Sequence, residues 1–234
     1  MIESLESRRL FAVTVSEAYP GYYEVYGDES DDVIDIAVSQ YNESFAIGED
    51  TYYGVCFIYV HAGAGDDAIS LISEDGSGLI AASVCAGDGS DTVVLNFDGS
   101  VWAGDGNDVL QISDAFRGEV YAGTGDDQIY VSGACVDPHI RAGDGDDLID
   151  ASANHYAVSA YGDDGSDTIY GSELGDTLRG GTGADFVYGG GGNDHFYVVD
   201  MEADSIFGGE GFDTTYANST EAVIGEDVEF VQNA

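Results

Sequence analysis

The sequence predicts an all-β fold, a right-handed parallel β-solenoid, from three features of the chain. Four nonapeptides follow one another without a gap from Gly162, each with an Asp sixth and an apolar residue eighth. Similar Gly- and Asp-rich turns recur earlier in the chain, roughly every 20 residues. The short segments between these turns alternate apolar and polar residues, which is the period of a β-strand. Because one such unit cannot bury its apolar residue alone, we expect the units to stack.

The first 12 residues, MIESLESRRLFA, differ from the rest of the chain. The segment from Leu5 to Ala12 resembles an L-E-x-R-x-L-L type of N-terminal motif found on secreted bacterial surface proteins, with Phe11 in place of the second Leu. It lacks the apolar run that a signal peptide or a transmembrane segment needs. Two interpretations of residues 1–12 stay open: a sorting-type motif, or a leader strand with a charged start.

Residues 13–61 are predicted to form degenerate β coils. Within them YGDESDDVI, from Tyr26 to Ile34, mirrors YGDDGSDTI, from Tyr161 to Ile169. Asp32 occupies the sixth position of this unit, and Ser30 stands where the later unit has Gly165. A residue other than glycine strains such a turn, so we do not expect an ion at Asp32.

Residues 62–217 are predicted to form the regular part of the solenoid, and residues 218–234 its closing strands. Turns begin at Ala62, Ala86, Ala103, Ala122, Ala142 and Gly162. Because each gap is close to two nonapeptides, only one edge carries Gly–Asp turns before Gly162, and both edges carry them afterwards. The residue two before each turn and the eighth residue are apolar throughout, so both should face the core. The residue just before each turn should face solvent.

The stretch from Tyr161 to Val199 resembles the RTX, or haemolysin-type, calcium-binding repeat family. Two of its four nonapeptides carry the complete G-G-x-G-x-D-x-U-x pattern of that family. Glycine turns let carbonyl oxygens converge, and Asp adds an anionic oxygen. Calcium takes six to eight such oxygens. The resemblance implies a β-roll with ions between successive turns, each held by turn carbonyls and the sixth-position Asp of each neighbour.

The residues that the resemblance marks as calcium ligands are sixth-position aspartates and turn glycines. The aspartates expected on one edge are Asp67, Asp91, Asp108, Asp127, Asp147, Asp167 and Asp185, and those on the other are Asp176, Asp194 and Asp213. The glycines are Gly63, Gly65, Gly87, Gly89, Gly104, Gly106, Gly123, Gly125, Gly143, Gly145, Gly165, Gly181, Gly183, Gly190 and Gly192. Leu174 with Gly175, and Glu210 with Phe212, depart from the pattern, which predicts weaker sites there.

The charge of the chain supports bound cations. It has 46 acidic and 5 basic residues and a formal net charge of −41. Such a chain repels itself when compact, yet 44% hydrophobic residues argue against disorder. Multiple calcium ions would resolve this conflict. Nucleic acid is not an expected partner, because no basic patch is present to neutralise phosphates, and membrane insertion is not expected.

No catalytic site is predicted, so we expect a protein that is not an enzyme. The four histidines lie in different coils and at different registers, and the three cysteines show no C-x-x-C spacing. Stacked Asp pairs could suggest acid–base chemistry, but their place in a periodic turn favours metal ligation.

The function expected from these features is that of a secreted bacterial structural protein, extracellular or at the cell surface. End-to-end stacking into filaments is expected, because neither end shows an obvious cap. Alternatives are a calcium-stabilised adhesin whose outward aromatic residues bind a cell-surface glycan, or a calcium-dependent module of a secreted enzyme system. An ice-binding roll needs a row of third-position threonines, and only Thr124 and Thr182 qualify.

Overall fold

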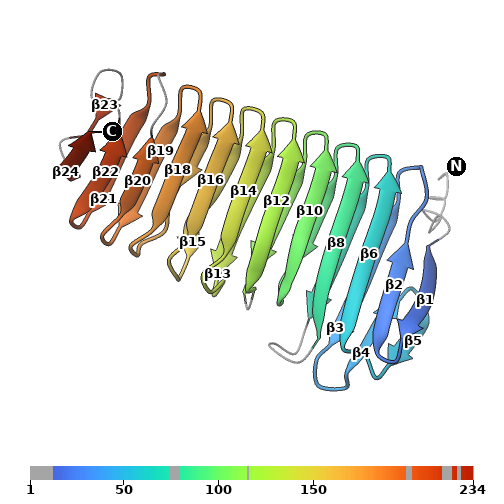
Figure 1. The fold of residues 1–234 in the computed structure, drawn as a ribbon. Helices are drawn as coiled ribbons and strands as arrows, with labels where there is room; N and C mark the ends of the chain where they lie inside the picture. The colour runs from blue at the N-terminus through green and yellow to red at the C-terminus, as the bar shows by residue number, and fades with distance from the viewer. Residues whose placement is uncertain are drawn as a thin grey trace, which may run out of the picture.

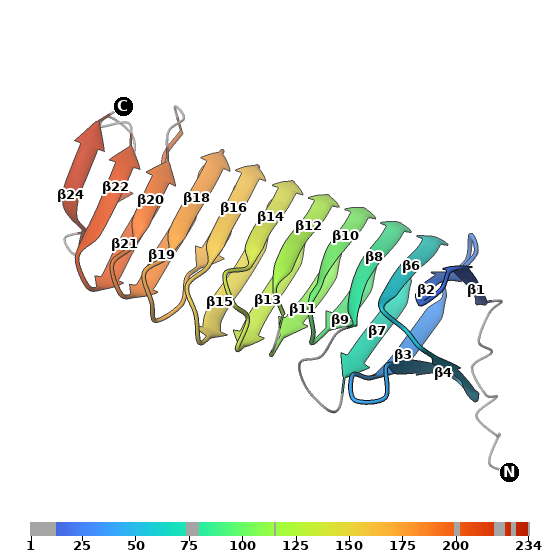
Figure 2. The ribbon, with the colours of Figure 1, turned by 60° about the horizontal axis from the view of Figure 1, so that its bottom comes forward.

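The computed structural model describes residues 13–73, 80–114, 116–198, 202–217, 223–225 and 228–233. Within these ranges the chain is all-β and contains no helix, which confirms the predicted fold class. Two 12-stranded sheets, here called sheet A and sheet B, lie face to face along a parallel β-solenoid (Figures 1 and 2). The N-terminal motif at Leu5–Ala12 lies outside the described residues, as do 218–222 of the expected closing strands.

The strands of each sheet follow one another along the solenoid axis. Sheet A contains, in spatial order, β1 (Thr14–Tyr19), β2 (Tyr22–Tyr26), β6 (Phe57–Ala64), β8 (Ala81–Asp88), β10 (Gly99–Asp105), β12 (Gly118–Thr124), β14 (His139–Asp144), β16 (Ser159–Asp164), β18 (Thr177–Thr182), β20 (His195–Val198), β22 (Asp213–Ala217) and β24 (Val228–Asn233). Sheet B contains β23 (Val223–Ile224), β21 (Ser205–Glu210), β19 (Phe186–Gly191), β17 (Thr168–Tyr170), β15 (Leu148–Asn154), β13 (Gln128–Gly133), β11 (Val109–Ser113), β9 (Thr92–Leu95), β7 (Ala68–Ser73), β3 (Val33–Ser39), β4 (Ser44–Ile47) and β5 (Asp50–Tyr53).

Two columns of apolar side chains, one from each sheet, run through the core. In sheet A the residues two before the turns pair in register: Val60, Val84, Val101, Val120, Ile140 and Ala160. In sheet B the eighth residues pair likewise: Ile69, Val93, Leu110, Ile129, Ile149 and Ile169. All twelve are buried, so the predicted inward columns are confirmed. Ile34 of the degenerate repeat pairs with Ile69 and extends the second column.

The N-terminal end of the solenoid is covered by antiparallel strands, which the sequence interpretation did not predict. Strand β1 runs antiparallel to β2, and β4 and β5 run antiparallel to β3 and β4. Phe45 stacks on Tyr52 with ring centroids 4.7 Å apart, and Tyr23 meets Phe45 edge-on at 5.3 Å. These three rings close the apolar core at that end, so the expectation of an uncapped N-terminal end was wrong.

The register predicts that alanine substitutions at two adjacent residues of β11 change the free energy of unfolding by very different amounts. Leu110 is fully buried in the core, whereas Gln111 points outward. Leu110→Ala should lower the free energy of unfolding by roughly 2–5 kcal/mol, because it removes buried methyl groups and leaves a cavity. Gln111→Ala should change it by less than about 0.5 kcal/mol. Urea unfolding in excess calcium measures both values, and similar losses would contradict the register.

Candidate functional site

The Gly–Asp turns form two rows along the solenoid. The turns that lead from sheet A to sheet B are here called the first edge, and those that return from sheet B to sheet A the second edge. In Figure 1 the first edge is the upper row of loops above β6 to β18. The structure places seven of the predicted aspartates, from Asp67 to Asp185, on the first edge, and Asp176, Asp194 and Asp213 on the second.

The second and fourth positions of the regular turns favour glycine. Gly87 has φ +124° and Gly89 has φ +135°, a region that L side chains rarely adopt. A Cβ atom on Gly87 would also overlap the carbonyl oxygen of Gly63 in the preceding coil. All fifteen glycines predicted as site residues have positive φ. The turns can therefore stack at the spacing of β-strands, with backbone directly against backbone.

The sixth-position carboxylates form a continuous buried ladder. On the first edge the Oδ1 atom of each Asp accepts the backbone N–H of the sixth-position Asp one coil earlier, from Asp32 to Asp185, over 2.6–3.0 Å. The same bond joins Asp176 to Asp194 and Asp194 to Asp213 on the second edge, at 2.7 and 2.9 Å. Each carboxylate therefore fastens two coils together.

The other carboxylate oxygen is the chemically unusual one. In seven of these residues Oδ2 is buried and has no hydrogen-bond partner: Asp67, Asp91, Asp108, Asp127, Asp147, Asp167 and Asp194. A buried anionic oxygen without a donor is costly. The same arrangement recurs in seven coils, so the turns share one geometry in which Oδ2 is left open, that is, without a hydrogen-bond donor. Carboxylate oxygens are hard ligands of the kind that suit Ca²⁺.

Burial shifts the acidity of the ladder. It raises the pKa of Asp108, Asp127, Asp167 and Asp194 to about 7, against an ordinary value of 3.8. Desolvation is the largest cause, the backbone N–H bond from the preceding coil opposes it, and neighbouring aspartates add to the rise. The metal-free turns thus carry an electrostatic penalty at neutral pH that a bound cation would offset.

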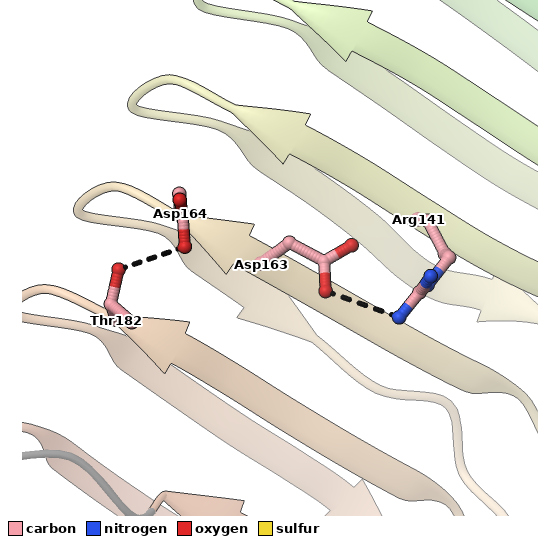
Figure 3. A network of polar contacts seen from close by, with 4 residues as sticks. All are labelled: Arg141, Asp163, Asp164 and Thr182. Atoms are coloured by element: carbon pink, nitrogen blue, oxygen red, sulfur yellow. Dashed lines mark hydrogen bonds and ion pairs between the residues drawn. The ribbon is translucent and has the colours of Figure 1, made fainter.

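The third- and fifth-position side chains face solvent instead. Asp88, Asp105, Asp144 and Asp164 in the third position are exposed. Thr182 donates from its hydroxyl to Asp164 over 3.1 Å (Figure 3). In the fifth position Asp146 accepts the N–H of Ser166 over 2.8 Å. These acids increase the negative potential around each turn without entering the buried ladder.

Asp163 is a turn residue that takes the place of a glycine. It occupies a second position and has φ +78°, which is uncommon for a residue with a side chain. Its carboxylate lies 3.4 Å from Arg141 Nη2, as the dashed line in Figure 3 shows. Because both side chains are partly exposed, this pair contributes little to stability.

Two buried aspartates belong to the ladder in addition to the calcium ligands predicted from the sequence. Asp204 is 2% exposed and accepts the N–H of Asp185 over 3.0 Å, so it extends the first edge. It was missed because no glycine turn precedes it, although Ala203-Asp204 before a strand repeats Ala184-Asp185. Asp32 is also buried, but its Oδ2 accepts the N–H of Asp28 over 2.7 Å.

Other kinds of metal centre have no support in the described part of the chain. No group of three or more His, Cys, Asp and Glu side chains there could hold a metal ion. No helix in the described ranges could cross a membrane.

Comparison with known proteins identifies the turns. A family model described as the RTX calcium-binding nonapeptide repeat (4 copies) matches residues 139–155 and 170–198. These ranges contain Asp147, Asp176, Asp185 and Asp194 together with their turn glycines. A search of curated protein sequences found no match.

Two adjacent aspartates provide a matched test of the ladder. Asp147 is buried with an open Oδ2, whereas Asp146 is exposed; each accepts one backbone N–H through Oδ1. Asp147→Asn should markedly reduce the rise in melting temperature on adding calcium, because Asn keeps the Oδ1 bond but removes the anionic oxygen. Asp146→Asn should leave that rise nearly unchanged. Differential scanning calorimetry with and without calcium measures both, and equal effects would contradict the assignment.

The raised pKa values predict opposite pH responses with and without metal. Folded pKa values of about 6 to 7 exceed the unfolded value of 3.8, so the folded state holds more protons between these limits. The metal-free protein should therefore gain stability as pH falls from about 7 to 4. Apparent calcium affinity should fall over the same range, because protons compete for the carboxylates.

Melting temperatures measured across this pH range, with and without calcium, test both trends. A metal-free protein that loses stability on acidification would contradict the desolvated ladder.

Proposed function

The chain is an RTX calcium-binding repeat protein folded as a parallel β-solenoid, and from this premise we propose that it is a secreted structural protein consolidated by calcium. The observation that supports this proposal most strongly is the row of buried, unpartnered Oδ2 atoms. The protein must hold those charges in a dry environment, and it supplies no N–H or O–H group for them. A divalent cation shared between neighbouring turns would convert the repulsion into attraction.

Calcium binding would then be coupled to folding. The ladder brings carboxylates of successive coils together only in the folded state, so a cation binds that state preferentially and stabilises it by mass action. Sites of this kind in extracellular modules have dissociation constants of roughly 10⁻⁴–10⁻³ M. That range suits an environment rich in calcium, which supports an extracellular or cell-surface location in bacteria.

Each segment of the chain has a proposed role in this calcium-stabilised solenoid. Residues 13–61 would act as the N-terminal cap of the roll, since β1, β4 and β5 cover its end. Residues 62–217 would form the calcium-binding roll, and 218–234 its closing strands. RTX repeats are typically structural and non-catalytic, which supports a role without enzymatic activity for the whole chain.

Filament formation and glycan binding stay predictions. Coil-on-coil stacking needs matching parallel edges, and the antiparallel strands at the N-terminal end disfavour it; negative-stain microscopy in calcium tests it. On the outer face of sheet A, Trp102 stacks on Tyr121 with ring centroids 6.0 Å apart and planes 7° from parallel. Such pairs stabilise a sheet on their own account, so a glycan array must show whether they also bind sugars.

A calcium titration followed by circular dichroism tests the proposed function. In a chelator at low salt the protein should lose β signal and melt at a lower temperature, because the carboxylates repel one another. Millimolar calcium should restore both, whereas the same ionic strength of sodium chloride should not. A protein that is equally folded and equally heat-stable in chelator and in calcium would overturn the proposal.

A further inference from the structure

The second edge of the solenoid changes its chemistry along the chain. In its N-terminal part, side-chain amides join neighbouring coils. Asn96 accepts the N–H of Ser73 over 2.7 Å and donates from Nδ2 to the Ser73 carbonyl over 3.0 Å. Asn154 forms the same two-way contact with Cys135, and Gln40 with Ile80. An amide supplies both a donor and an acceptor, so these coils are joined without any charge that needs a cation.

The next residue on that edge is Asp176, a carboxylate that protein donors satisfy. Its Oδ1 accepts the N–H of Val158 over 2.7 Å and the hydroxyl of Ser172 over 3.0 Å. Its Oδ2 accepts the N–H of Ser172 over 2.6 Å. Asp176 is 1% exposed, and neither of its oxygens is among the buried atoms without a partner. It therefore differs from the aspartates in regular turns, although it occupies the same position of its nonapeptide.

One coil further on, Asp194 has the opposite arrangement. It is fully buried, its Oδ1 accepts the N–H of Asp176 over 2.7 Å, and its Oδ2 has no partner. The second position of its turn is Gly190, with φ +102°. The two turns thus differ in the residue at the second position and in whether Oδ2 accepts a hydrogen bond.

The backbone at the second position decides between these two states. Ser172 is not among the residues with positive φ, and its N–H points at the carboxylate of its own turn. Asp28 in the degenerate repeat also lacks a positive φ and donates to Asp32 Oδ2 over 2.7 Å, although Asp32 Oδ1 is buried without a partner. Asp163 gives the converse case: it has a side chain but a positive φ, and the Oδ2 of Asp167 in its turn stays open. The decisive feature is therefore the backbone conformation, which glycine favours.

We propose that Ser172 closes the turn at Asp176 to cations, so that calcium binding on the second edge begins at Asp194. This inference rests on the proposed calcium function and refines it. The family pattern places a ligand at Asp176 as well as at Asp194, but the contacts of Asp176 hold its charge with three hydrogen bonds from the protein. Leu174, whose N–H donates to the Ser172 hydroxyl over 3.1 Å, secures this closed turn.

Asp176→Asn and Asp194→Asn form the matched test, since both residues are buried on one edge and one coil apart. Isothermal titration calorimetry with calcium chloride should show that Asp194→Asn loses calcium relative to the unaltered protein, while Asp176→Asn binds the same number of ions. Asp176→Asn should lower the melting temperature equally in chelator and in calcium, because its amide would face the N–H of Ser172. Asp194→Asn should lower it in calcium only.

The double variant Ser172→Gly/Leu174→Gly provides the reverse test, because it restores glycine to the second and fourth positions. It should bind one more calcium ion than the unaltered protein, by equilibrium dialysis with radioactive calcium. Unchanged stoichiometry in this variant, or equal calcium loss in both Asn variants, would overturn the inference. If the unaltered protein binds no calcium, the proposed function itself fails, so the two failures are distinguishable.

Discussion

The rest of the structure depends on keeping like charges stacked inside the protein. Strands of a sheet repeat at about 4.8 Å, so an aspartate in every turn places carboxylates above one another along a dry edge. Hydrogen bonds from the backbone satisfy one oxygen of each and fix its direction. In the regular turns the second oxygen has no hydrogen-bond donor. Under the proposed function, the cation that neutralises that oxygen would decide whether the solenoid is compact under given conditions.

Glycine makes this stacking geometrically possible, but it also makes folding of the turns entropically costly. A turn free of Cβ atoms can lie directly on the next turn, but glycine loses much conformational entropy on folding. Each regular coil buries few apolar side chains in return, mainly aliphatic ones such as Val120 and Ile129. Larger rings are buried in both early and late coils, at Phe97, Phe116 and Phe196, but in the earlier coils amides join the second edge. Dependence on ions should thus be uneven along the chain, and greatest where both edges carry carboxylates.

Much of the fold could be predicted because the repeat couples turn chemistry to strand register. A period of nine places every sixth residue on an edge and every eighth in the core, and the structure follows both rules. Strand direction at the N-terminus could not be read in this way, because alternation is the same for parallel and antiparallel strands. Asp204 could not be predicted as part of the ladder, because no glycine-rich turn precedes it in the sequence. The closed turn at Asp176 depends on the backbone conformation of Ser172, and composition alone does not determine this.

The direction of the ladder has a consequence for how such a molecule is completed. Every N–H of a sixth-position aspartate on the first edge donates to the aspartate of the coil that follows it in the chain, from Asp32 N–H to Asp67 Oδ1 onward. Within this ladder each buried amide is thus satisfied by the coil that follows it, whereas the exposed fifth-position bonds run in the opposite sense, as from Ser166 N–H to Asp146. The ladder therefore has a direction. If coils are removed from the C-terminal end, the last remaining first-edge aspartate keeps a buried backbone N–H that has lost its acceptor. Length in this architecture can be added or removed only by moving that incomplete end.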